Sequence, residues 1–437
     1  MIRRLSWLTM VMALGVTLLL AKACGRPANA APPPHLLSEA PWAGNVRVND
    51  DTGSANHQSS PSIAVDPEGN AYAVWMDRRS GYDDIYFAYR PAGGSWGTNV
   101  RVSDDTGTDG QDRPCIAVDP EGDAYAVWMD FRNGISNPDI YFSYRPSGGS
   151  WSANIRVNDD EGTCGQYDPS IAVDPSGNAY ALWTDNRNGG YWLHPDIYFS
   201  YRPAGGDWGT NVKVDDDATG ADQGGCSIAV DASGNAYALW SDDRNGDWNS
   251  DVYFSYRPAG GSWETNVRVD DDPGTGGTGS TSIAVDATGN AYAVWEDSRG
   301  GSTNLDIYFS YRPSGGSWGA NVRVDDDPGT GSQDWPSIAV DPTGNAYAVW
   351  EDERILADSD IYLSYRPAAG AWGASVRLND DVGTPNEQRD PSIAVDPSGS
   401  AFAVWFDVRN EWDPDIYFCS NWWAFKVYVP LTMRKHQ

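Results

Sequence analysis

Lysine, histidine and cysteine are scarce in this sequence. Its 437 residues include four lysines, four histidines and five cysteines, while 61 acidic residues stand against 30 basic ones and give a net charge of −31. Lysine is nearly absent from the body of the chain. We therefore expect no nucleic-acid or anionic-lipid partner, because binding phosphates requires basic side chains that displace counterions. With 40% hydrophobic residues and 21 tryptophans, the chain can nevertheless bury a core.

Motifs of several catalytic classes are also absent. The sequence has no Cys-x-x-Cys or Cys/His metal spacing and no histidine in a nucleophile–base pattern. A catalytic site needs an acid, a base and a nucleophile in unlike environments, so it should break the symmetry of a repeat. The repeat described below is hardly broken anywhere. We therefore expect a binding protein more than an enzyme.

Residues 1–30 are predicted to be a signal peptide. Arg3 and Arg4 precede an apolar run that is too short for a membrane span, and Ala28-Asn29-Ala30 offers a cleavage site. The mature chain would begin near Ala31 and be secreted, with no integral membrane span after processing. Residues 31–40 would then form a Pro-rich spacer.

Cysteine offers one alternative to free secretion. A lipid anchor at Cys24 would hold the chain at the cell surface, although the residues before it match the lipoprotein cleavage box poorly. Export would permit disulfides. The remaining cysteines occupy different repeat positions, however, and we interpret them as isolated substitutions of small residues. They are Cys115, Cys164, Cys226 and Cys419.

A unit of about 55 residues occurs seven times and dominates the sequence. Its anchor Ile-Ala-Val-Asp recurs at steps of 53, 55, 57, 55, 55 and 55 residues, and a fixed period of this size indicates a propeller, solenoid or array. Each unit contains four runs rich in Val, Ile, Tyr, Phe and Trp, which predict four strands. In the first unit these runs are 62–65, 71–75, 84–90 and 96–102. The anchors begin at Ile63, Ile116, Ile171, Ile228, Ile283, Ile338 and Ile393.

These units predict an all-β protein, a seven-bladed β-propeller of four-stranded antiparallel blades over residues 41–420. Runs two and three are apolar on both faces, as expected where sheets stack face to face around an axis. The last unit stops after its third strand, whereas a matching fourth-strand segment, 42–48, stands before the first unit. The N-terminal strand should therefore complete the last blade and close the ring. Residues 421–437 remain as a C-terminal tail.

A W-x-D-x-R motif follows every second strand and should lie on the face of the inter-blade loops. Two interpretations stay open. The pairs could interlock neighbouring blades, because arginine forks match carboxylates, or they could form a ring of contacts to a sugar or carboxylate ligand. The pairs are Asp77 and Arg79, Asp130 and Arg132, Asp185 and Arg187, Asp242 and Arg244, Asp297 and Arg299, Asp352 and Arg354, and Asp407 and Arg409.

Each blade-to-blade loop opens with acidic residues that precede a glycine. Turn formation explains this pattern, because aspartate caps tight turns. Clustered carboxylates are also suited to Ca²⁺, the one cofactor that the sequence suggests, although the spacing differs from an EF-hand loop. The candidate ligands are Asp50, Asp51, Asp215, Asp216, Asp217, Asp325, Asp326 and Asp327.

Aromatic residues fall into two groups. The tryptophan at the end of each second strand, such as Trp75, is expected to pack between blades. Aromatic residues in the variable loops are candidate platforms for stacking on sugar faces, although packing at the rim explains them equally. They are Tyr82, Tyr191, Trp192, Trp248, Trp335 and Trp412.

The turn between strands three and four is similar to the Asp-box, S-x-D-x-G-x-x-W. Ser143–Trp151 and Ser310–Trp318 share its Ser, Gly and Trp, lack its Asp, and are one residue longer. On these residues the array resembles the sialidase-like, BNR (Asp-box) propellers of secreted bacterial proteins. The resemblance implies a propeller, typically of six blades, and sialidase chemistry with three arginines, a Tyr–Glu pair and an Asp. The Arg-Ile-Pro motif of that family does not occur, and Glu296 and Glu351 occupy an ordinary variable position.

We therefore expect a secreted, non-catalytic, monomeric propeller that binds glycan or protein through its inter-blade loop face. One alternative is a sialidase-type glycoside hydrolase with a diverged site. Another is a purely structural or adhesive surface module.

Overall fold

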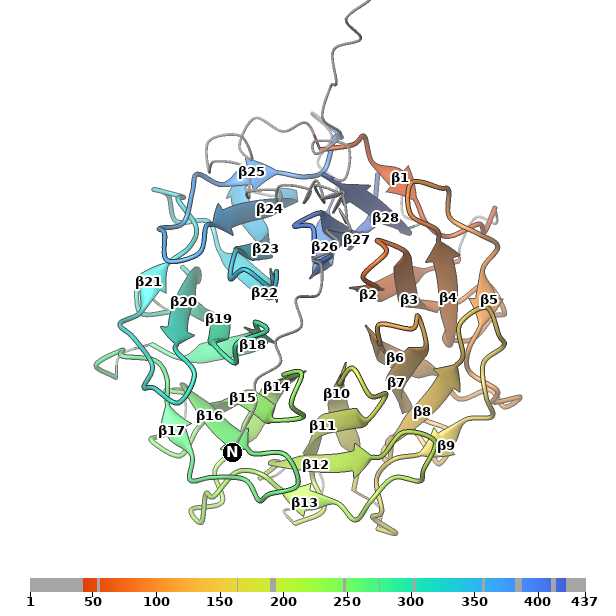
Figure 1. Ribbon diagram of the computed structural model, residues 1–437, viewed down its shortest axis with the longest axis horizontal. Helices are drawn as coiled ribbons and strands as arrows, with labels where there is room; N and C mark the ends of the chain where they lie inside the picture. The colour runs from red at the N-terminus through yellow and green to blue at the C-terminus, as the bar shows by residue number, and fades with distance from the viewer. Residues whose placement is uncertain are drawn as a thin grey trace, which may run out of the picture.

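A computed structural model describes residues 42–421, apart from 53–55, 163, 189–193, 247–248, 275, 302–303, 356–357, 382–386 and 410–413. The predicted signal peptide, the spacer and all but the first residue of the tail lie outside the described residues. Seven four-stranded antiparallel sheets surround a central axis (Figure 1), which confirms the predicted all-β, seven-bladed propeller. Within the described part of the chain, no helix is long and apolar enough to cross a membrane.

Each blade runs from an innermost to an outermost strand. The innermost strands are β2 (Gln58–Val65), β6 (Gln111–Val118), β10 (Gln166–Val173), β14 (Gln223–Val230), β18 (Thr278–Val285), β22 (Gln333–Val340) and β26 (Gln388–Val395). The second strands are β3 (Ala71–Asp77), β7 (Ala124–Asp130), β11 (Ala179–Asp185), β15 (Ala236–Asp242), β19 (Ala291–Asp297), β23 (Ala346–Ile355) and β27 (Ala401–Asp407). The third strands are β4 (Asp84–Arg90), β8 (Asp139–Arg145), β12 (Asp196–Arg202), β16 (Asp251–Arg257), β20 (Asp306–Arg312), β24 (Asp358–Arg366) and β28 (Asp415–Ser420). The outermost strands are β5 (Val100–Arg101), β9 (Ile155–Arg156), β13 (Val212–Lys213), β17 (Val267–Arg268), β21 (Val322–Arg323), β25 (Val376–Arg377) and β1 (Val46–Arg47).

The N-terminal strand closes the ring. β1 pairs antiparallel with β28, with Val46 opposite Phe418, and Figure 1 shows these two strands side by side. The Val48 N–H donates to the Ile416 carbonyl at 2.8 Å, and the Val48 side chain is buried. The predicted closure is confirmed, and the third strand of the last blade is thereby covered.

Strand lengths differ from prediction at both ends of the blade. The third strand of the first unit has the predicted bounds, 84–90, but the innermost strand begins at Gln58 instead of residue 62. A β-bulge between Ser59 and Ser62 lets these extra polar residues pair with β3. The outermost strand is shorter than predicted and comprises only Val100–Arg101, because it lies at the solvent-exposed edge of the sheet.

The interface between blades is built on the repeated tryptophans. Trp75 is fully buried and packs with Phe402, Val404 and Phe418 of the last blade. Its indole N–H donates to the carboxylate of Asp77 at 2.9 Å. The prediction that these tryptophans pack between blades is confirmed. The four cysteines after Cys24 are free, in agreement with their interpretation as isolated substitutions.

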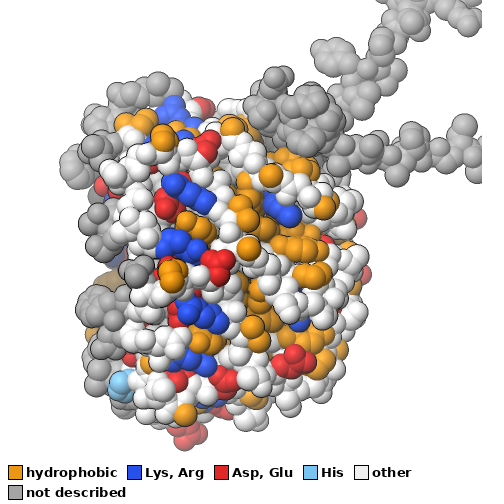
Figure 2. All heavy atoms as spheres, turned by 90° about the vertical axis from the view of Figure 1, so that its left-hand side faces the viewer, with side chains coloured by type: hydrophobic (Ala, Val, Ile, Leu, Met, Phe, Trp, Pro, Cys, Tyr) orange, Lys and Arg blue, Asp and Glu red, His pale blue; other side chains and the backbone are white. Residues whose placement is uncertain are grey.

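The outer wall of the ring carries paired charges. Figure 2 shows basic side chains in a row along this wall, with acidic side chains beside them and hydrophobic side chains exposed between them. Arg323 on the outermost strand β21, for example, lies 2.6 Å from Asp306 at the start of β20. Short, charged outer strands oppose edge-to-edge pairing between rings.

Candidate functional site

The W-x-D-x-R motifs form an inter-blade clamp, defined here as each motif arginine together with two aspartates. The guanidinium of Arg79 contacts the carboxylate of Asp77 at 2.8 Å and that of Asp50 at 2.7 Å. Asp50 follows the last blade's outermost strand, so Arg79 joins two blades. The same outer pairs recur as Arg132–Asp104, Arg187–Asp159, Arg244–Asp216, Arg299–Asp271, Arg354–Asp326 and Arg409–Asp380.

The clamp confirms the interlocking interpretation of these motifs. The motif aspartates are fully buried in all seven blades, and Arg79 also lies over the ring of Tyr86 at 4.4 Å from the centroid. Direct ligand contacts by the motif residues stay a prediction. The buried aspartates would be reached only by moving the arginines that cover them.

The candidate calcium ligands serve several separate contacts. Among the described residues, no group of three or more His, Cys, Asp or Glu side chains is placed to hold a metal ion. Calcium at these loops therefore stays a prediction from the sequence. Three of them, Asp50, Asp216 and Asp326, belong to inter-blade clamps. Two form ion pairs with bases on the outermost strands, Asp215 with Lys213 and Asp325 with Arg323. Asp217 accepts a hydrogen bond from the Thr219 N–H, Asp51 accepts one from Asn56, and Asp327 is buried.

The loop aromatics divide between described and undescribed parts of the chain. Tyr191, Trp192, Trp248 and Trp412 lie outside the described residues. Tyr82 is 47% exposed in the loop after β3. Trp335 is 48% exposed, but its placement in a variable loop is wrong, because it belongs to the innermost strand β22. A bulge between Asp334 and Ser337 lets that strand begin at Gln333 and so include Trp335.

A cavity of about 810 Å³ lies where the innermost strands begin. All seven of these strands contribute their first residues to its lining, and Figure 1 shows the strands arranged around the centre of the ring. Asp222, Asp243 and Ser250, from the loops beside β14 and β15, also line it, as do Ser241 of β15 and Glu296 of β19. The cavity thus opens on the face of the inter-blade loops. We call it the channel mouth.

One position of the channel mouth differs between blades, and we call it the bulge position. It is three residues before each anchor isoleucine, and its residues are Ser60, Arg113, Asp168, Gly225, Ser280, Trp335 and Asp390. Six of these seven residues have φ between 50° and 57°. Non-glycine residues adopt such a conformation at a cost, and strained positions of this kind cluster at functional sites.

The expectation that the repeat is hardly broken is wrong at the bulge position. The signal that could have revealed it is an alignment of the units on their anchors, because Gln precedes this position by two residues in six units and Ile-Ala-Val-Asp follows it in all seven. The bulge position precedes the apolar run 62–65, so the strand pattern of the sequence does not include it.

Arg113 lies among three carboxylates of the channel mouth. Its guanidinium forms an ion pair with Asp168, and its backbone N–H donates to Asp112 at 2.7 Å. The negative charge of Asp390 also favours the protonated form of Arg113 and so raises its pKa. Burial raises the pKa of Asp112 and of Asp390, so these carboxyl groups hold their protons to a higher pH than usual.

A second group of carboxyls lies in blades five to seven. Glu296 accepts the Trp335 N–H at 3.3 Å, and Glu351 accepts the Asp390 N–H at 2.7 Å. Asp334 and Glu351 are directly opposite each other across β22 and β23. Burial, and next the charge of Glu296, raises the pKa of Asp334 to about 7, and burial raises the pKa of Glu351 to about 8. Glu296 and Asp390 line the channel mouth, Asp334 lies on the strand that carries Trp335, and Glu351 is bonded to the strand that carries Asp390. Carboxyls with perturbed pKa values near a cavity are candidates for a functional site.

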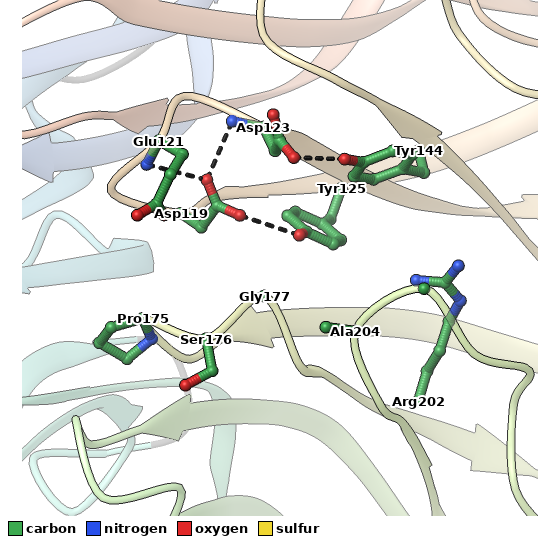
Figure 3. Close-up of a pocket in the computed structure, with 11 residues that line it drawn as sticks. Asp119, Glu121, Asp123, Tyr125, Tyr144, Pro175, Ser176, Gly177, Arg202 and Ala204 are labelled. Atoms are coloured by element: carbon green, nitrogen blue, oxygen red, sulfur yellow. Dashed lines mark hydrogen bonds between the residues drawn. The ribbon is translucent and has the colours of Figure 1, made fainter.

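A second pocket, of about 420 Å³, lies between blades two and three on the face of the hairpin turns. Figure 3 shows Asp119 and Tyr125 on one side of it and Ser176 and Arg202 on the other. The Tyr125 hydroxyl donates to Asp119 at 2.9 Å. Equivalent bonds recur as Tyr72–Asp66, Tyr180–Asp174, Tyr237–Asp231 and Tyr292–Asp286. This pocket therefore consists largely of a repeated turn device, and the channel mouth is the stronger candidate site.

No protein-family model and no curated relative matches the chain. Among solved structures, a polysaccharide lyase described as an ulvan lyase has a TM-score of 0.58 at 13% identity, covering 86% of this chain and 95% of that one. A lectin from Burkholderia pseudomallei has a TM-score of 0.55 at 9% identity, covering 79% and 95%. A protein of unknown function from Dyadobacter fermentans has a TM-score of 0.53 at 12% identity, covering 87% of this chain and 98% of that one. These likenesses show the β-propeller fold.

Proposed function

We propose that this chain is a secreted propeller that binds glycan at the channel mouth, on its inter-blade loop face. The observation that carries the proposal is the broken symmetry at the bulge position. Seven equivalent strands meet around one cavity and present unlike side chains there. Ligand sites combine such a concave surface with a few convergent polar groups.

Trp335 supports a sugar as the ligand. Its side chain is half exposed at the channel mouth, and aromatic rings stack well on the apolar faces of sugars. The structural neighbours include proteins named as a lectin and as a polysaccharide lyase, which favours glycan as the ligand class. The resemblance of the repeat to sialidase-like propellers points the same way.

A glycan array probed with the chain from Ala31 tests this proposal. We expect hits that Trp335→Ser removes, and serine already occupies the equivalent position as Ser60. Tyr82→Ser is the matched control, because its ring is equally exposed but lies in an outer loop. Loss of binding in Tyr82→Ser alone would move the site to the loops. Hits that disappear in EDTA would support calcium, and a blank array would favour protein adhesion or a structural role.

Cleavage of the glycan is a second candidate function. The observation that favours it is the pair of facing carboxyls, Asp334 and Glu351, since general acid–base catalysis needs groups that exchange protons near the working pH. Release of new sugar ends from array hits by the wild-type chain, and its loss in Glu351→Gln, would support catalysis. Glu68→Gln, in a hairpin turn on the opposite face, is the control. Absence of release with binding intact would leave a lectin.

A further inference from the structure

The channel mouth is strongly acidic. Among the described residues that line it, six are acidic and Arg113 is the one base. Such an arrangement repels anionic ligands, because like charges in a partly enclosed site are poorly screened. The six acids are Asp112, Asp168, Asp222, Asp243, Glu296 and Asp390.

The arginine does not offset this acidity. Arg113 is paired with Asp168 and lies within the field of Asp112 and Asp390. Arg389, just outside the lining, pairs with Glu387 at 3.1 Å. An anionic sugar would thus have to displace carboxylates that already hold these bases.

Gln223 is a second and independent sign of a ligand. Gln223 lines the channel mouth and is only 2% exposed, and within the described part of the chain neither atom of its side-chain amide has a hydrogen-bond partner. In blades one, three and seven the equivalent glutamine accepts from an asparagine, as Gln58 does from Asn49 at 3.1 Å. The carbonyls of Gln111 and Gln333 also lack a partner, but among the described residues Gln223 alone of the six glutamines has neither amide atom bonded. Asp215, which follows the outermost strand of blade three, takes the place of that asparagine beside blade four, and no hydrogen bond joins it to the Gln223 amide. A buried amide without partners calls for a polar ligand.

The neighbouring residues leave room for that ligand. Beside Gln223, a Cβ on Gly224 would meet no atom within 4 Å, so this part of the lining is open. The bulge positions of blades four and five are the small residues Gly225 and Ser280. Asp168 precedes them around the ring and Trp335 follows them, so a carboxylate and an aromatic platform flank the open sector.

We propose that the channel mouth selects oligosaccharides of cationic amino sugars, which fit over blades four and five. This inference rests on the proposed glycan function. Protonated amines and hydroxyls supply the donors that the carboxylates and the Gln223 carbonyl accept, and the sugar face stacks on Trp335.

Calorimetry with a matched pair of ligands tests the selection. Glucosamine tetramer and its N-acetylated form share one backbone and differ in charge. At pH 6 and low salt we expect the glucosamine form to bind at least about tenfold more tightly, with an affinity that falls as salt rises. Equal or tighter binding of the N-acetylated or an anionic oligosaccharide would overturn the inference but leave the glycan function standing. Binding of no oligosaccharide would overturn both.

Variants separate the site from general attraction to an acidic protein. Trp335→Ser leaves the net charge unchanged, so loss of glucosamine binding in it identifies the channel mouth. Asp390→Asn should weaken binding several-fold, whereas Asp207→Asn, an equal charge change in an exposed hairpin turn, should have no effect. Gly224→Tyr, which copies Tyr167 of blade three, should block the open sector. Tetralysine binding as tightly as the sugar, or glucosamine binding that survives Trp335→Ser, would contradict the proposal.

Discussion

The inter-blade clamp makes a sharp prediction about two aspartates that share one arginine. Asp77 and Asp50 both contact Arg79, but Asp77 is fully buried whereas the side chain of Asp50 is 40% exposed. Asp77→Asn and Asp50→Asn make the same chemical change. We expect the first to be far more destabilising than the second.

The expected magnitudes follow from the contacts. Asp77 accepts four hydrogen bonds, from the Trp75 indole, the Arg79 backbone and two guanidinium nitrogens. An asparagine side chain would keep one oxygen for two of these donors and turn its NH2 group toward the other two, and it would leave Arg79 without its buried anion, which costs about 3–5 kcal/mol. Asp50→Asn removes an ion pair at the surface and should cost about 1 kcal/mol or less.

Urea unfolding followed by tryptophan fluorescence measures the difference, because a tryptophan indole donates to the motif aspartate in every blade. The pH dependence supplies a control. Partial burial acts to raise the pKa of Asp50, but the Asn99 N–H and Arg79 outweigh it and the pKa lies below its usual value. The stability contributed by Asp50 is therefore present above its unfolded pKa and lost as the pH falls through the folded value. If Asp77→Asn and Asp50→Asn lower the free energy of unfolding equally, burial does not set the contribution of the two aspartates and the prediction is wrong.

Two further predictions concern the carboxyl cluster and the ring closure. Because the pKa of Glu351 is raised to about 8, the stability that its protonation contributes is present at low pH and lost as the pH rises through that value. In urea unfolding, the free energy of unfolding of Glu351→Gln should therefore equal that of the wild type at pH 5 and exceed it at pH 9 by on the order of 3 kcal/mol. A difference that stays constant with pH would contradict the raised pKa of Glu351. A chain that starts at Asn49 lacks β1 and exposes the edge of β28, so we expect a lower unfolding midpoint and self-association by gel filtration. A chain from Trp42 is the control, and equal behaviour of the two would mean that closure contributes little.

The architecture was predictable because its determinants are local. The hairpin turn after β2 places Gly69 at φ 83° and lets the Asp66 carboxylate accept the Asn70 N–H at 2.9 Å, so a short sequence motif is sufficient to reverse the chain. The closure could be inferred because a fourth-strand pattern stands at the start of the array. These signals repeat in every unit, and each copy reinforces the others.

The candidate site was not predictable in the same way. Gln58–Pro61 is polar and contains a proline, so its residues carry no strand pattern of their own. They pair with β3 only through a bulge. Nothing in the local sequence places Trp335 at a shared cavity, because its neighbours there come from units tens of residues away. The D-x-R motifs are evident in the sequence because they repeat, and their arginines and aspartates form the inter-blade clamp.

The bulge position separates the demands of folding from those of function, and glycine tests the separation. Trp335 has φ of 51° and is 48% exposed, so its side chain gains little from packing while its backbone is strained. Glycine adopts this conformation without strain and already occupies the position as Gly225, with φ of 57°. Trp335→Gly should therefore raise the free energy of unfolding by about 1 kcal/mol while abolishing glycan binding. If Trp335→Gly instead destabilises the protein, the tryptophan serves the fold and the argument for a ligand at the channel mouth loses its main support.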